Sequence, residues 1–160
     1  MAFIDLDTID PARTPSFYNV NMAVGYGCPN MEEDVKVVQF FLKRVFEIDF
    51  LKNKKPWGQM TIDGKVGPVT RAWIVKMQML APNVMIDGIV DKAGNENNPS
   101  NRLASLSHTD YTIRMINNLL RKKDTAVYKT LPTNPEVPAE MRLIFQQIHA
   151  AGPPMNFGNN

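Results

Sequence analysis

Apolar residues recur at intervals of three and four positions in four separate segments of the chain, and this spacing predicts four helices. The predicted helices cover residues near 31–47, 69–80, 108–123 and 138–150. The last has the plainest stripe, at i, i+3, i+4 and i+7: Met141, Ile144, Phe145 and Ile148. We therefore expect a mainly α protein, a small helical bundle with short turns, an N-terminal arm and an extra C-terminal helix.

Local signals mark the starts of three of these helices. Asn30 can cap the first helix, with Glu33 at the position that completes a capping box. Pro68 suits the first turn of the second helix, because its φ is already helical and its missing N–H needs no partner there. Ser107 and Asp110 give a capping signal before the third helix.

The segments between the helices suggest the domain organisation. Residues 1–29 show no sustained period, so we expect an extended arm, with a short strand allowed, anchored by Phe17, Tyr18, Val20, Met22 and Val24. Residues 131–138 are rich in proline and predict an extended connector. The predicted parts are the arm at 1–29, a helical domain at 30–123, the connector with the C-terminal helix at 124–152, and a flexible tail at 153–160.

The second predicted helix is apolar on most of its sides, which indicates that more than one neighbour covers it. The arm and the C-terminal segments are the expected covers. The apolar stripe of the C-terminal helix also needs cover, either from this chain's own core or from a partner protein, because four such side chains left bare would be unusual on a monomer. Of these two alternatives we expect core packing.

One short phrase occurs twice: IDGKVG begins at residue 62 and IDGIVD begins at residue 86, which is 24 residues later. Asp-Gly is typical of tight turns, because glycine adopts positive φ and the aspartate side chain can bond to its own backbone. We expect Asp63-Gly64 and Asp87-Gly88 to form short turns or β-bridges that hold the helices. Gln39 lies between the apolar positions of the first helix, and we interpret it as satisfying nearby backbone groups rather than as a ligand contact.

The order of these motifs resembles the peptidoglycan-binding-like domain, a three-helix cell-wall module. The resemblance covers about residues 30–91, and its matching residues are Asp34, Val35, Val38, Gln39, Leu42, Asp63, Gly64, Val66, Gly67, Pro68, Thr70, Gln78, Asp87, Gly88 and Val90. It implies a non-catalytic module that binds the glycan or stem peptide of peptidoglycan in a shallow groove. The implied groove lies near the Asp-Gly turns and the start of the second helix, with candidate contacts Trp57, Asp63, Lys65 and Arg71.

Trp57 stands in a lysine-rich loop that runs from about residue 48 to residue 58. One interpretation is that an exposed Trp57 and its neighbouring lysines bind a sugar or an acidic partner. The preferred interpretation is that Trp57 folds back over the core while the lysines stay solvated.

Composition excludes several classes of function. The chain has 160 residues, 44% apolar and 21% charged, as is ordinary for one globular domain. Its formal net charge of +2 does not suggest a nucleic-acid partner. A single cysteine, Cys28, allows no internal disulfide, and two histidines complete no zinc-site spacing. No nucleophile, metal or phosphate-binding motif stands out, so we expect no enzyme, no metal and no cofactor.

The N-terminus has no basic region followed by an apolar run, and no segment is apolar enough for membrane insertion. We therefore expect cytoplasmic synthesis, with delivery to the envelope by host lysis, a phage particle or a contractile secretion machine if the ligand is the cell wall. The alternative function is a protein–protein adaptor or structural component of a phage or secretion apparatus that reuses the fold. The sequence leaves the oligomeric state open.

Overall fold

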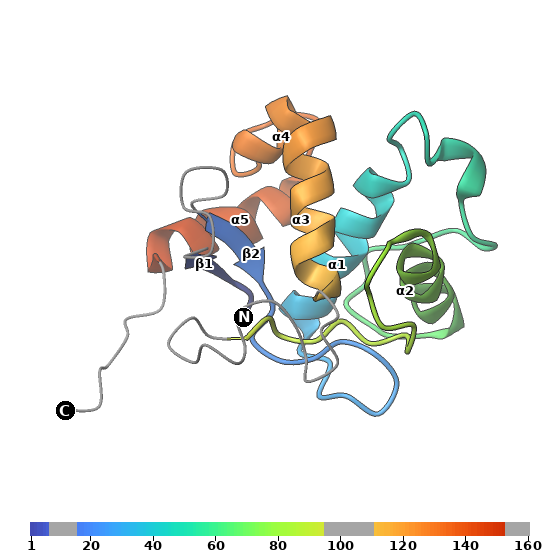
Figure 1. Cartoon of the computed structure of the whole chain (residues 1–160). Helices are drawn as coiled ribbons and strands as arrows, with labels where there is room; N and C mark the ends of the chain where they lie inside the picture. The colour runs from blue at the N-terminus through green and yellow to red at the C-terminus, as the bar shows by residue number, and fades with distance from the viewer. Residues whose placement is uncertain (7–15, 95–110, 153–160) are drawn as a thin grey trace.

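A computed structural model describes residues 1–6, 16–94 and 111–152, and it is mainly helical, as the apolar spacing predicts (Figure 1). Two short strands, β1 and β2, pair antiparallel with Ile4 opposite Tyr18. The elements are β1 (Phe3–Leu6), β2 (Ser16–Asn19), α1 (Glu32–Val45), the 3₁₀ turn η1 (Lys52–Lys54), α2 (Pro68–Leu80), α3 (Thr112–Lys123), α4 (Thr125–Lys129) and α5 (Ala139–Ala151).

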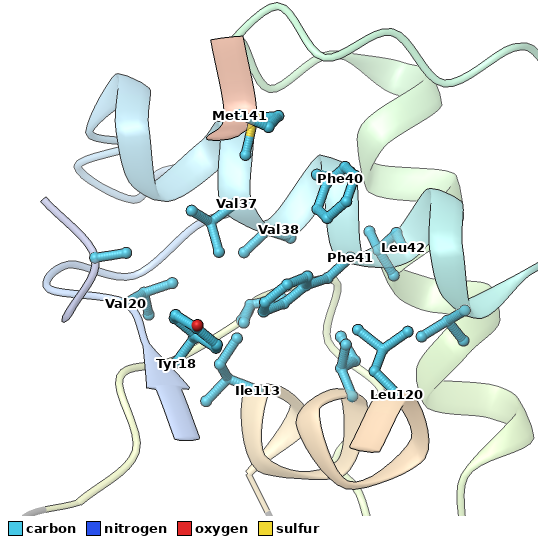
Figure 2. Close-up of a cluster of buried hydrophobic side chains, with 14 of the residues drawn as sticks. Tyr18, Val20, Val37, Val38, Phe40, Phe41, Leu42, Ile113, Leu120 and Met141 are labelled. Atoms are coloured by element: carbon cyan, nitrogen blue, oxygen red, sulfur yellow. The ribbon is translucent and has the colours of Figure 1, made fainter. Parts of the chain in front are cut away.

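Helix α1 is the centre of the molecule, because α2, α3 and α5 all contact it. Figure 1 shows α2 on one side of α1 and α5 on the other. The Phe41 ring of α1 stacks on Phe145 of α5 with centroids 5.8 Å apart. Figure 2 shows the same ring among the side chains of Val38, Tyr18 and Ile113. The apolar residues of α1 are therefore buried on more than one side of the helix.

The N-terminal arm contributes directly to this core. Phe17, Tyr18, Val20 and Val24 are buried, as predicted for its anchors. Met22 is 41% exposed, so its prediction as an anchor was wrong. Only its backbone is anchored, because its N–H donates to the buried carboxylate of Asp34 at the start of α1.

Helix α5 is also part of the core. Its stripe of Met141, Ile144, Phe145 and Ile148 is buried, which confirms the expected core packing. The helix contacts α1 and β1 rather than α2, so α5 is not one of the expected C-terminal covers of α2, whereas Thr112 at the start of α3 hydrogen-bonds to Gln78 of α2. The loop after α1 also covers α2, because Phe46 packs edge-on against Trp73 with ring centroids 5.3 Å apart.

Two local predictions were wrong. Asn30 does not cap α1; it has a φ of 50°, and its amide bonds to both backbone groups of Gly25 at 2.8 Å. Residues 131–138 are not an extended connector, because turn hydrogen bonds follow one another there and Leu131 and Val137 are buried. The capping signal at Ser107 and Asp110 and the predicted flexible tail both lie outside the described residues.

The contact between β2 and α5 makes a prediction about acid stability. The Tyr18 hydroxyl lies 2.6 Å from Nε2 of His149, and burial lowers the pKa of His149 below its ordinary value of 6.5. Above about pH 6.5 His149 is neutral in both the folded and the unfolded chain. As the pH falls below this value, the unfolded chain takes up the proton first, so the free energy of unfolding decreases. We therefore expect the melting temperature to fall between about pH 7.5 and about pH 5.5 by more in the wild type than in His149→Gln. Equal pH dependence of the two proteins in thermal melts would contradict this.

Candidate functional site

The first Asp-Gly turn is held by the side chain of Gln39 from α1. Oε1 of Gln39 accepts hydrogen bonds from the backbone N–H of Asp63 at 3.1 Å and of Gly64 at 3.0 Å. Nε2 of Gln39 donates to the Asp63 carboxylate at 2.9 Å, to the Lys65 carbonyl at 3.0 Å and to the Thr70 hydroxyl at 3.2 Å. One buried amide thus joins α1, the turn and the first turn of α2, which confirms the interpretation of Gln39 as a residue that satisfies backbone groups.

The second Asp-Gly turn repeats this arrangement one helix later. Oε1 of Gln78 from α2 accepts from the N–H of Asp87 at 3.1 Å and of Gly88 at 2.8 Å. Nε2 of Gln78 donates to the Asp87 carboxylate, to the Ile89 carbonyl and to the Thr112 hydroxyl of α3. We call each such unit, a glutamine with its turn and its threonine, an amide clamp.

Glycine is required in both clamps. Gly64 and Gly88 have φ values of +73° and +72°, a region that side chains rarely adopt, as the turn motif predicts. A Cβ on Gly64 would also lie 2.5 Å from Cγ of Glu32. The sequence therefore predicted the two turns correctly, from the repeated phrase alone.

A third buried amide, which the sequence analysis missed, lies on α3. Asn117 accepts from the Tyr18 N–H and donates to the Tyr18 carbonyl, each at 2.9 Å, so that it grips strand β2 as the glutamines grip the turns. Gln39, Gln78 and Asn117 are spaced 39 residues apart, and each follows apolar residues four and one positions earlier. This spacing was the signal that could have identified Asn117.

The four candidate contacts lie around the start of α2. Lys65 and Arg71 are exposed, and so is Asp63 apart from the oxygen held inside the turn. Trp57 is 65% exposed, so the preferred interpretation that it covers the core was wrong. The core position is filled by Trp73, whose Nε1–H donates to the Trp57 carbonyl at 3.3 Å and fixes the loop below the exposed ring.

Tyr26 also belongs to this surface, although nothing in its sequence context marked it. Its ring lies 5.4 Å from the guanidinium carbon of Arg71. Tyr26 is half exposed and stands on the loop that follows β2. Only the folded chain brings this loop, 45 residues earlier in the sequence, next to α2.

Three acidic groups at and near this surface have shifted pKa values, each with a local cause. Hydrogen bonds from Gln39 and the Lys65 N–H lower the pKa of Asp63, which keeps this carboxylate charged and inside the turn. Burial raises the pKa of the Cys28 thiol, with Asp91 and Asp87 adding to the effect, so the thiolate is disfavoured. Burial also raises the pKa of Asp91. No group of three residues suited to hold a metal ion occurs within 1–6, 16–94 and 111–152.

A hollow of about 350 Å³ lies elsewhere, between the end of α1 and the junction of α3 with α4. Arg44 and Asp124 meet there in a bidentate ion pair, with N–O distances of 2.8 and 2.9 Å. This pair satisfies both charges within the wall of the hollow. None of the helices in the described part of the chain has both the length and the apolar character needed to cross a membrane.

No protein-family model matches the chain, and neither the curated proteins nor the solved structures contain a significant match.

Proposed function

We propose that this protein is a non-catalytic module that binds peptidoglycan through the surface around the start of α2. The observation that carries the proposal is the pair of equivalent amide clamps. The residues that resemble the cell-wall module in sequence, Gln39 with Asp63 and Gln78 with Asp87, meet in space as two copies of one unit. Such agreement between spacing and contacts favours a shared architecture over a chance match of short phrases.

Exposed side chains around the start of α2 support the same proposal. An exposed indole offers a flat apolar face to the faces of a sugar ring, while its backbone is fixed by Trp73. Lys65 and Arg71 add exposed positive charge around the start of α2, which suits the carboxylates of a peptidoglycan stem peptide.

Co-sedimentation with purified sacculi tests the proposal. We expect the wild type to sediment, and Trp57→Ala to bind roughly thirtyfold more weakly, the effect of losing an aromatic hot spot worth about 2 kcal/mol. Charge reversal of Lys65 and Arg71 should also weaken binding, and with changes in stability of only about 0.5 kcal/mol each, as for most surface substitutions.

Matched controls lie outside the four candidate contacts. Phe50→Ala removes an aromatic ring that is 53% exposed at the hollow beside Arg44 and Asp124, and Lys129→Glu reverses an exposed charge on α4. Both variants should sediment like the wild type. If the wild type does not sediment, the function is wrong; if all variants sediment equally, the site is wrong.

A protein–protein adaptor of a phage or secretion apparatus is the second candidate. Exposed apolar side chains on the loop before α1 and on the second turn favour it: Met22, Met31, Met85 and Ile86 are each between 41% and 58% exposed. The Val24–Val90 bridge joins these two segments. Size-exclusion chromatography with light scattering, alone and with candidate apparatus proteins, separates this function from wall binding.

A further inference from the structure

The guanidinium of Arg71 lies against an aromatic ring of this chain, and its N–H groups have no acceptor in the described residues. Its carbon lies 5.4 Å from the centroid of the Tyr26 ring, and in the described part of the chain it makes no hydrogen bond or ion pair. Stacking on a ring face leaves the N–H groups at the edge of the guanidinium plane free to donate. An oriented, unpaired arginine fork is the arrangement that recognises planar anions.

Two glycines lie at this contact. A Cβ on Gly88 would lie 3.4 Å from Cγ and 3.5 Å from Nε of Arg71, which is ordinary van der Waals distance, so the arginine stem passes directly over this turn. A Cβ on Gly25 would lie 2.7 Å from the Gly88 carbonyl oxygen, so a side chain there would push the Tyr26 loop away from the turn.

The Tyr26 loop is itself fixed on both sides. Val24 exchanges two backbone hydrogen bonds with Val90, at 3.0 and 2.8 Å. Asn30 closes the loop through its paired bonds to Gly25. Tyr26 is therefore presented to Arg71 by rigid backbone, and little conformational freedom remains to be lost when a ligand binds.

We propose that Arg71, positioned by Tyr26, is the element of this surface that recognises a carboxylate, and that its ligand group is the carboxylate of a peptidoglycan stem peptide. The inference rests on the proposed wall-binding function for the source of that group. A singly charged carboxylate fits better than a doubly charged phosphate. Asp87 stands in the same turn as Gly88, and its negative charge would repel a doubly charged anion more strongly. Oδ1 of Asp87 is occupied by Gln78 and by the Ile89 N–H, so Asp87 does not reach out to neutralise Arg71 through that oxygen.

The direct test follows the Arg71 Nε–H resonance by NMR. The probes are a short peptide that ends in D-alanine with a free carboxylate, the same peptide as its terminal amide, and inorganic phosphate. We expect a saturable shift with the free acid and little with the amide or phosphate. Tyr26→Leu should weaken the titration about fivefold or more, because the fork loses its orientation, whereas Tyr26→Phe keeps the ring and rescues it. Arg71→Lys should weaken sedimentation with sacculi although the charge is kept.

The sacculus assay is run in parallel on native sacculi and on sacculi whose carboxylates have been blocked as amides. Weaker binding of the wild type to blocked sacculi supports the inference, and equal binding to both overturns it while the proposed function stands. No binding to either overturns the proposed function, and the peptide titration still decides the carboxylate site. Equal shifts with acid and amide, a stronger response to phosphate, or no shift overturns the inference whatever the sacculi show. Thermal melts of each variant show whether any loss reflects unfolding.

Discussion

Replacing Phe145 with alanine is expected to lower the free energy of unfolding by about 4 kcal/mol, the usual range for removing a large buried ring. The Phe145 side chain is fully buried, and its ring lies 5.2 to 5.8 Å from the rings of Tyr18, Phe40 and Phe41. The cavity left behind would open at the junction of α1, α5 and β2. Chemical denaturation followed by circular dichroism measures the change.

The control lies on the same helix. Leu143 is 59% exposed, so Leu143→Ala removes a similar apolar group from solvent and should change stability by no more than about 0.5 kcal/mol. Deleting residues 131–160 should abolish the cooperative melt, since the whole stripe of α5 goes with it. If Phe145→Ala and Leu143→Ala have the same small effect, α5 does not dock on the core in solution.

Replacing Gln39 with alanine is expected to cost about 3 kcal/mol, because the variant removes five hydrogen bonds and leaves the buried N–H of Gly64 without its acceptor. The neighbouring N–H of Asp63 loses its acceptor as well. The first turn and the start of α2 are then joined to α1 by packing alone. We expect a lower midpoint in denaturant, together with weaker sedimentation with sacculi if the proposed surface depends on the turn.

Gln147→Ala is the matched control, since Gln147 is exposed on α5 and makes no contact of this kind in the described residues. It should leave the midpoint within about 0.5 kcal/mol of the wild type. A Gln39 variant that is as stable as the Gln147 variant would mean that water replaces the amide at little cost, and the clamp would then not be a structural unit.

The two clamps give the proposed surface its physical basis. Each places an Asp-Gly turn at a defined position against the next helix, so that exposed side chains near the start of α2 are presented by rigid backbone. Trp57 depends on a different support, the hydrogen bond from Trp73 to its carbonyl. Loss of either support should affect binding before it affects the remote core around Phe145.

The sequence by itself predicted those features that depend on neighbours along the chain. The helical spacing placed α1, α2 and α5 to within about two residues, and Asp-Gly predicted two turns with positive φ at Gly64 and Gly88. Pro68 indicated the start of α2 correctly, because its restriction of φ acts whatever the tertiary surroundings are. The stripe of α5 also indicated burial correctly, because four apolar side chains on one helix face need cover whatever the rest of the fold is.

What the tertiary structure decided is where contacts form between distant residues. Asn30 is a good cap by composition, yet Gly25 competes for its amide and α1 begins without a side-chain cap. Trp57 was predicted to cover the core, and Trp73 occupies that place instead. The pairing of Tyr26 with Arg71 and the grip of Asn117 on Tyr18 join segments 45 and 99 residues apart. No local preference of the sequence specifies such contacts. They depend on which surfaces meet when the faces of α1 are buried, and this packing is decided by the whole chain.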